Sequence, residues 1–172
     1  MHYDYPIEQV ARSARTRFQL GFARFTMKLL PSFDDVLFEP STQGLRMLAA
    51  TETALTIPNE VIRQMHADEV EIGKPSVRLL YEGEVLEPIM WVRVSVGHSD
   101  AEPVLQDLVS REAVIEEADW GHPRTVIRAR APLRRLLGYV QALPGLSDSE
   151  ADVRMWLSHY QRLPPGPKND AA

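Results

Sequence analysis

The feature that most constrains the fold of this chain is the strict alternation of side chains over residues 89–96. One side of this segment carries the apolar residues Met90, Val92, Val94 and Val96. The other side carries Ile89, Trp91, Arg93 and Ser95. A period of two residues is that of a β-strand with one strongly apolar face. Such a face must be covered by other elements, so the strand predicts a sheet with one side packed on a core.

The segments after this strand give its partners. They are a helical apolar stripe over 101–112, strands over 113–118 and 125–131, a helix of about ten residues from Leu133, and a last strand over 153–160. The resulting order is βαββαβ, which is the ferredoxin-like split βαβ unit with two helices on one face of an antiparallel sheet. We therefore predict an α+β protein whose residues 85–163 form a ferredoxin-like domain.

The first half has weaker patterns. Residues 7–18 have apolar side chains at helical spacing, and residues 18–30 favour a helix that gives way to a strand, because apolar residues alternate over 23–29. The remaining predictions are short strands over 36–38 and 45–49, a helix over 58–65 and a strand over 76–81. Residues 1–84 are expected to form a smaller α+β domain, and the proline-rich polar residues 164–172 a disordered tail.

Composition narrows the classes of function. The 172 residues include no cysteine and carry a formal net charge of -5, with acids and bases spread over both halves. Disulfides and thiolate metal sites are thereby excluded, and the absence of cysteine suits a cytoplasmic protein. The five histidines are scattered, so we predict no metal site and no cofactor. No apolar run approaches the length of a membrane span.

Four short motifs in residues 86–163 occur together and in order. They are Leu86-Glu87-Pro88-Ile89-Met90, the helix Val104–Arg111 with its Leu-x-x-Arg ending, Leu136-Leu137-Gly138-Tyr139, and Ser158-His159-Tyr160. In this combination the segment resembles the C-terminal, fifth domain of elongation factor G and related translational GTPases. The resemblance implies a ferredoxin-like fold, a link to translation and contact with large-subunit ribosomal RNA.

The first half also resembles this family. Glu52, Leu55 and Ile57, followed by Gly73-Lys74-Pro75, are similar to the end of its third domain, which would lead directly into Leu86. A rival alignment places Phe18–Pro31 and Ile57-Pro58-Asn59-Glu60 on the fourth domain. The third-domain alignment is the one we favour.

No Gly-x-x-x-x-Gly-Lys-Ser/Thr phosphate loop occurs in the sequence, so GTP binding and hydrolysis have no sequence support. Other catalytic arrangements are equally weak. Glu116 and Glu117 are adjacent on a predicted strand and are expected to point to opposite faces. His98-Ser99-Asp100 is interpreted as a loop in which Ser99 or Asp100 caps a helix. We expect a protein that is not an enzyme and whose GTPase domain is absent.

RNA binding through phosphates requires arginine or lysine. The candidate RNA-contacting residues are Arg111, Arg124, Arg128, Arg134, Arg135 and the turn residue Trp120, with Arg130 on the same predicted strand as Arg128. Two departures from the family weaken this interpretation: Glu112 and Ala113 stand in its Arg-Arg-Gly turn, and the loop 145–150 has two acids and no base. The competing interpretation is a solvated face in which these arginines pair with Glu116, Glu117 and Asp119.

Two functions follow from these observations. The first is a non-catalytic module that binds the ribosome or ribosomal RNA. The second is a regulatory module that has kept the fold, lost RNA binding, and binds a protein partner or a second copy of itself through the open face of the sheet.

Overall fold

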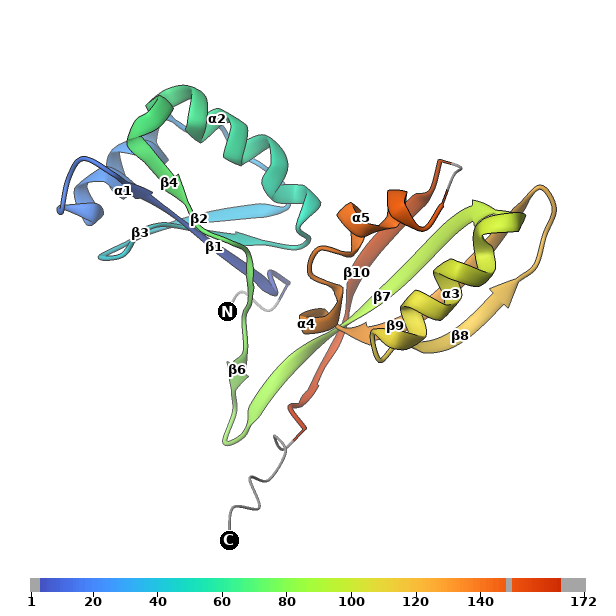
Figure 1. The fold of residues 1–172 in the computed structure, drawn as a ribbon. Helices are drawn as coiled ribbons and strands as arrows, with labels where there is room; N and C mark the ends of the chain where they lie inside the picture. Colours follow the sequence, from blue (N-terminus) through green and yellow to red (C-terminus); the bar gives the residue numbers. More distant parts are fainter. Residues whose placement is uncertain (1–3, 148–149, 165–172) are drawn as a thin grey trace, which may run out of the picture.

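The computed structural model describes residues 4–147 and 150–164 (Figure 1). These residues form two five-stranded sheets, each with helices on one side. The predicted disordered tail, apart from Pro164, and residues 148–149 of the acidic loop lie outside the described residues.

The N-terminal unit, residues 7–77, is built on the first sheet. Its elements are β1 (Ile7–Ser13), α1 (Gln19–Leu29), β2 (Val36–Ser41), β3 (Gly44–Ala49), the 3-10 turn η1 (Thr53–Leu55), α2 (Thr56–His66), the 3-10 turn η2 (Ala67–Glu69), β4 (Val70–Ile72) and β5 (Ser76–Val77). The strand order is β2-β3-β1-β4, and β5 pairs with the other end of β1. This unit therefore also has the βαββαβ order.

The C-terminal unit, residues 80–163, is built on the second sheet. Its elements are β6 (Leu80–Tyr81), β7 (Val85–Gly97), η3 (His98–Asp100), α3 (Ala101–Ser110), β8 (Val114–Asp119), β9 (Arg124–Pro132), α4 (Leu133–Leu136), α5 (Tyr139–Ala142), η4 (Leu143–Gly145) and β10 (Asp152–Arg162). The order β10-β7-β9-β8 is antiparallel throughout. The predicted α+β class and the ferredoxin-like βαββαβ order are confirmed.

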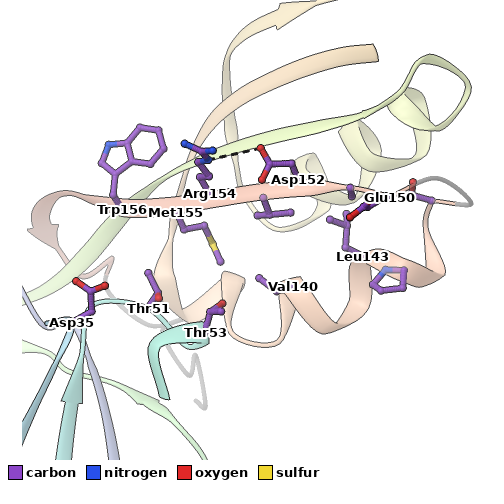
Figure 2. A pocket seen from close by; sticks show the side chains of 14 residues that line it. Asp35, Thr51, Thr53, Val140, Leu143, Glu150, Asp152, Arg154, Met155 and Trp156 are labelled. Atoms are coloured by element: carbon purple, nitrogen blue, oxygen red, sulfur yellow. Dashed lines mark ion pairs between the residues drawn. The ribbon is translucent and has the colours of Figure 1, made fainter. Parts of the chain in front are cut away.

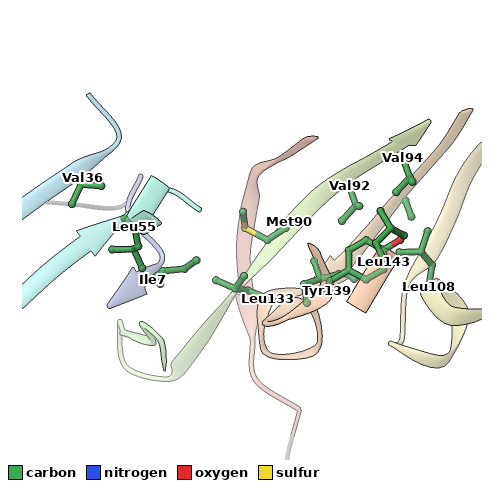
Figure 3. Packing of buried hydrophobic residues seen from close by; sticks show 14 of the residues in the cluster. Ile7, Val36, Leu55, Met90, Val92, Val94, Leu108, Leu133, Tyr139 and Leu143 are labelled. Atoms are coloured by element: carbon green, nitrogen blue, oxygen red, sulfur yellow. The ribbon is translucent and has the colours of Figure 1, made fainter. Parts of the chain in front are cut away.

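The alternation in β7 produces the core as predicted. Met90, Val92, Val94 and Val96 are each at most 1% exposed. They face Leu108 of α3 and Tyr139 of α5, as Figure 3 shows for most of this group. Burying each of these aliphatic side chains stabilises the fold by about 1.5–3 kcal/mol relative to leaving it in water. The open face of the sheet is thus the face that carries Trp91 and Arg93.

The second helix of this unit differs from the prediction of one ten-residue helix. It is divided into α4 and α5 at Gly138, whose φ is +79°. A positive φ is strained for residues with a Cβ and easy for glycine, so the chain turns there rather than continuing as a helix. The Gly138 N–H then donates to the Glu52 carboxylate of the N-terminal unit at 2.7 Å.

The helix predicted for residues 7–18 is wrong, because residues 7–13 form the central strand β1. Its inward side chains are Ile7, Gln9 and Ala11, all buried. Because Gln9 is polar, the sequence of β1 does not show the apolar alternation of a strand with one buried face. The burial of Gln9 is satisfied in part by a hydrogen bond from its Nε2 to the Gly73 carbonyl at 2.7 Å.

The strand predicted within residues 18–30 is also wrong, because residues 19–29 form the helix α1. Its buried residues are Ala23 and Thr26, whereas Phe25 and Leu29 are exposed. Because Phe25 and Leu29 are apolar but exposed, the apolar residues of α1 do not follow the spacing that marks the buried face of a helix.

The strand predicted over 76–81 is divided between the two sheets as β5 and β6. The strands over 36–38 and 45–49 and the helix over 58–65 are confirmed as parts of β2, β3 and α2.

Candidate nucleic-acid interface

Three of the predicted arginines meet where α3 ends. Arg134 Nη2 donates to Glu112 Oε2 at 2.6 Å, and Arg135 Nε donates to Glu112 Oε1 at 2.8 Å. Arg111 joins them by donating from Nη1 to the Arg135 carbonyl at 2.9 Å. Glu112, which the resemblance places where the family's turn has an arginine, here binds two cations of the predicted site.

A buried acid ties this cluster to the sheet. Glu87, near the start of β7, is only 1% exposed and accepts a hydrogen bond from Arg134 Nε at 2.8 Å. The hydrogen bonds from Arg134 and then Arg135 lower the pKa of Glu112, and the bond to Glu112 is the main reason that the pKa of Arg134 is raised. The acid of the Leu-Glu-Pro motif therefore anchors α4, and the charges of this cluster are largely neutralised within the protein.

Arg124 and Arg128 lie apart from that cluster. Arg124 is bound by the protein itself, since its Nη2 donates to the carbonyls of Ser95 at 2.5 Å and Glu150 at 3.0 Å. Arg128 forms an ion pair with Glu117.

The two adjacent acids of β8 reach the same side of the sheet. Arg130 Nε donates to Glu116 at 2.6 Å, and Arg128, on the same face of β9, pairs with Glu117. The expectation that Glu116 and Glu117 point to opposite faces is wrong, because the β8–β9 register shifts between Ile115 and Glu117. A bulge of this kind re-aims a side chain.

The open face of the second sheet carries a pair of tryptophans. Trp156 of β10 lies opposite Trp91 of β7, and their rings stack with centroids 6.3 Å apart and planes 20° apart. Arg130, opposite Trp91 on β9, places its guanidinium 5.2 Å from the Trp91 ring centroid. Trp156 is 45% exposed, so one indole of the pair is open to a ligand.

A row of arginines runs beside the tryptophans. The strand register places Arg154, Arg93 and Arg128 side by side across β10, β7 and β9. Arg93 lies 3.4 Å from the Asp152 carboxylate, and Arg154 lies 3.8 Å from it. In Figure 2, Arg154 and Trp156 project from the side of β10 opposite to Met155. We refer to Trp91, Trp156, Arg93, Arg128, Arg130 and Arg154 as the tryptophan–arginine face.

From the sequence, only Arg128 and Arg130 of this face were predicted as RNA contacts. The sequence feature that could have identified the rest of this face is the other side of the alternating strand β7, the side that carries Trp91 and Arg93. Its pairing with Arg154 and Trp156 depends on the strand register.

Trp120 is not brought to this face. It lies in the β8–β9 turn, 48% exposed, with its ring edge-on to His98 at 6.2 Å. Asp100 does not cap α3 with its side chain; it accepts a hydrogen bond from Ser147 at 2.9 Å instead. Among residues 4–147 and 150–164, no group of three or more acidic or histidine side chains is arranged to hold a metal ion. Within that same part of the chain, no helix has the length and apolar character needed to cross a membrane.

A groove of about 950 Å³ separates the two units (Figure 2). Asp35, Thr51 and Thr53 line it from the N-terminal unit, and α5 and β10 line it from the other. Its walls carry the acids Asp35, Glu150 and Asp152 together with Arg154 and Trp156, so the groove has charges of both signs and lies beside the tryptophan–arginine face.

The comparisons with known proteins agree with this architecture. The family model described as elongation factor G C-terminus matches residues 84–171. Over 81 residues the chain is 40% identical to elongation factor G of Fervidobacterium nodosum, a match that covers 46% of this chain and 12% of that protein.

A protein of Thermus thermophilus of known crystal structure has the same fold over 93% of this chain, with a TM-score of 0.65 and 16% identity. The match covers 41% of that protein, so the chain spans less than half the length of either relative. The family model covers just over half of the chain, including all of β7 to β10. The chain therefore belongs to the elongation factor G C-terminus family.

Proposed function

We propose that this protein is a non-catalytic, translation-associated module that binds ribosomal RNA in the cytoplasm through its tryptophan–arginine face. The family relation supports the link to translation. The absence of a phosphate loop in the sequence supports binding rather than nucleotide hydrolysis. The remaining support comes from the chemistry of the face itself.

The observation that carries the proposal is the stacked pair of Trp91 and Trp156 beside four arginines. Bases that are not paired stack on aromatic rings, and guanidinium groups bind the phosphates between them. A four-stranded sheet that presents aromatic side chains on its open face is a common way to bind single-stranded RNA. The exposed indole of Trp156 would accept the first base.

The ion pairs on this face do not prevent binding. Arg128 and Glu117 are 40% and 58% exposed, and pairs of that kind contribute about 0–1 kcal/mol. A phosphate could replace such a carboxylate at small cost. Arg134 is different, because its departure would leave the buried Glu87 without its cation. RNA contacts by Arg111, Arg124, Arg134, Arg135 and Trp120 remain predictions and rank below the face.

The proposal is tested by co-sedimentation with ribosomes and separated subunits at increasing salt. Binding to the large subunit should fall steeply with salt, because arginine contacts release counterions. Replacing Trp156 by alanine should weaken binding by about 5- to 150-fold, corresponding to the loss of one stacked base. The matched control is Tyr81→Ala, which removes an aromatic side chain that is 78% exposed on β6 and is not part of the face. Failure to pellet with ribosomes at low salt would refute the proposal.

A second function is favoured by a separate observation. Arg111, Arg128, Arg134 and Arg135 all have carboxylate partners within the protein, which suits a surface that has lost RNA. The module would then be regulatory and bind a protein, or a second copy through the sheet face. Sedimentation equilibrium of the wild type and of Trp156→Ser tests the second case, since a dimer formed through this face should dissociate in the variant.

As part of the same proposal, we assign residues 1–84 to a segment like the third domain of elongation factor G. The spacing along the sequence between Glu52 and Gly73-Lys74-Pro75, which resembles that of the family, supports this assignment. The βαββαβ order of residues 7–72 is compatible with it.

A further inference from the structure

The N-terminal unit exposes a row of large apolar side chains that its own fold does not cover. Phe18, Phe25 and Leu29 are 68%, 59% and 57% exposed. In a helix with about 100° per residue, Phe25 and Leu29 lie within about 40° of each other. Phe18 immediately precedes α1 and extends the row, because its ring lies on Gly21, where an added Cβ would come within 2.3 Å of it. We call these three residues the apolar row of α1.

The neighbouring helix fixes which side of α1 faces outward. Thr26 Oγ1 lies 2.8 Å from His66 Nε2 of α2, and the Phe22 ring contacts the His66 ring with centroids 4.9 Å apart. Ala23 and Thr26 are buried against the sheet. The apolar row therefore lies outside the contact with α2, on the surface of the unit.

A basic row runs beside the apolar row, on the flank away from α2. Arg24 and Lys28 of α1 and Arg17, which precedes the helix, are all exposed, and Arg24 and Lys28 lie roughly 60–100° around the helix axis from Phe25. Over the described ranges 4–147 and 150–164, none of these three cations forms an ion pair. The arginines around Glu112 in the C-terminal unit, by contrast, are neutralised by carboxylates of the protein. The basic row presents positive charge to a partner.

We propose that these two rows form a docking surface for an acidic amphipathic helix of a partner protein. A helix that lies along α1 can place apolar residues on Phe18, Phe25 and Leu29 and a row of Asp or Glu beside the three cations. Single exposed apolar residues are ordinary, whereas three large ones along one helix with unpaired cations beside them are typical of an interaction site. This surface is separate from the tryptophan–arginine face and does not depend on RNA binding.

The charges around α1 favour a helical partner over RNA or an anionic membrane. The exposed charges of the neighbouring helix and turn are mixed, with the acids Glu60 and Asp68 and the base Arg63. A broad anionic surface that reached the basic row would also meet these acids. A narrow rod that follows α1 avoids them, so charge complementarity selects a helix.

The test uses a fluorescein-labelled synthetic peptide of about 15 residues, long enough to cover the eleven residues of α1. The peptide carries leucines at helical spacing and glutamates on one flank. Titration with the intact protein should give saturable binding that Phe25→Ser/Leu29→Ser weakens by about tenfold or more. Arg24→Glu/Lys28→Glu should weaken it to a similar degree and increase its affinity for the charge-reversed peptide.

Matched controls lie on the next helix. Ile57 is 62% exposed on α2, and Arg63 is exposed there too, so Ile57→Ser and Arg63→Glu change similar chemistry away from the two rows. Both controls should bind the acidic peptide like the wild type. Circular dichroism of each variant verifies that the unit is folded.

Three results would overturn the inference. They are equal binding of the acidic and charge-reversed peptides, no saturable binding of the acidic peptide, and equal loss in the control variants. Loss of vesicle binding, single-stranded RNA binding or self-association in Phe25→Ser/Leu29→Ser, with peptide binding unchanged, would assign the rows to that other occupant. Ribosome pelleting of this variant should equal that of the wild type, so failure here is distinguishable from failure of the proposed RNA-binding function.

Discussion

The two units of this protein have the same order of elements and the same strand order but different surfaces. In the N-terminal unit the centre of the open sheet face is Arg46, held by Glu8 and Glu39 at 3.0 Å. In the C-terminal unit the corresponding region carries Trp91, Trp156 and a row of arginines. The exposed apolar side chains of the first unit lie instead on a helix. One topology thus presents two different binding surfaces, which supports the rule that function depends on side chains placed on a fold.

The largest expected effect is the loss of stability caused by a core substitution in one unit. It tests whether the two units unfold separately. Leu45 in the first unit and Leu108 in the second are both fully buried. Replacing either by alanine should destabilise its own unit by about 2–5 kcal/mol. All three tryptophans lie in the C-terminal unit, so their fluorescence reports that unit alone, whereas circular dichroism reports both. Leu108→Ala should shift the fluorescence transition, and Leu45→Ala should shift only the circular dichroism. A shift of both signals in both variants would show that the units unfold as one.

A second comparison uses one turn from each unit. Gly44, the first residue of β3, has φ +135°, and an added Cβ would lie 2.3 Å from the Ala11 carbonyl oxygen. Gly83, between β6 and β7, has φ +77° with nothing within 4 Å of an added Cβ. Gly44→Ala should cost about 2–3 kcal/mol and Gly83→Ala about 1 kcal/mol. Urea denaturation of both variants measures the difference, and equal losses would mean that the Ala11 contact relaxes.

The bond between the units is expected to contribute less. Glu52→Ala removes the acceptor of the Gly138 N–H and should lower stability by about 1 kcal/mol. The gap between the fluorescence and circular dichroism midpoints should also change, because this bond couples the units. Glu60→Ala, an exposed acid on α2, is the control. If the two variants behave alike, the bond does not link the units.

The smallest effect is a dependence of the first unit on pH. Burial lowers the pKa of His66, against the opposing charge of Glu69, so the folded state prefers the neutral ring more than the unfolded chain does. Stability from this source is present above the unfolded pKa of about 6.5 and falls as the pH decreases below it. His66→Gln should flatten this dependence in the circular dichroism transition. His122→Gln, in an exposed turn of the other unit, should leave it unchanged.

The difference between the units also explains which predictions succeeded. In the C-terminal unit the buried face of β7 is entirely apolar, so the pattern of the sequence and the burial of the residues agree. In the N-terminal unit β1 buries Gln9, and α1 exposes Phe25 and Leu29. Hydrophobic periodicity reports burial only when apolar residues are inside. Both wrong predictions therefore come from residues whose exposure depends on a partner. The partner of Gln9 is within the protein, and we propose that the partner of Phe25 and Leu29 is outside it.

The candidate interface shows the same limit. From the sequence, Arg128 was predicted as an RNA contact, and acids of the predicted strand 113–118 were named as partners that could neutralise it. The sequence could not reveal that the β8 bulge directs both Glu116 and Glu117 to the outer face, because a bulge changes the period of the strand without a change in residue type. Nor could it reveal that Arg134 and Arg135 both bind Glu112, or that Arg111 donates to the Arg135 carbonyl.

By itself the sequence determined the fold class, the βαββαβ order of residues 85–163 and the resemblance to elongation factor G, because these depend on local periodicity and short motifs. The tertiary structure decided which charges are neutralised, which tryptophans meet and which apolar residues stay exposed. These properties depend on strand register and on contacts between residues far apart in the chain. Trp91 and Trp156 are 65 positions apart in the sequence and become neighbours only when β10 pairs with β7.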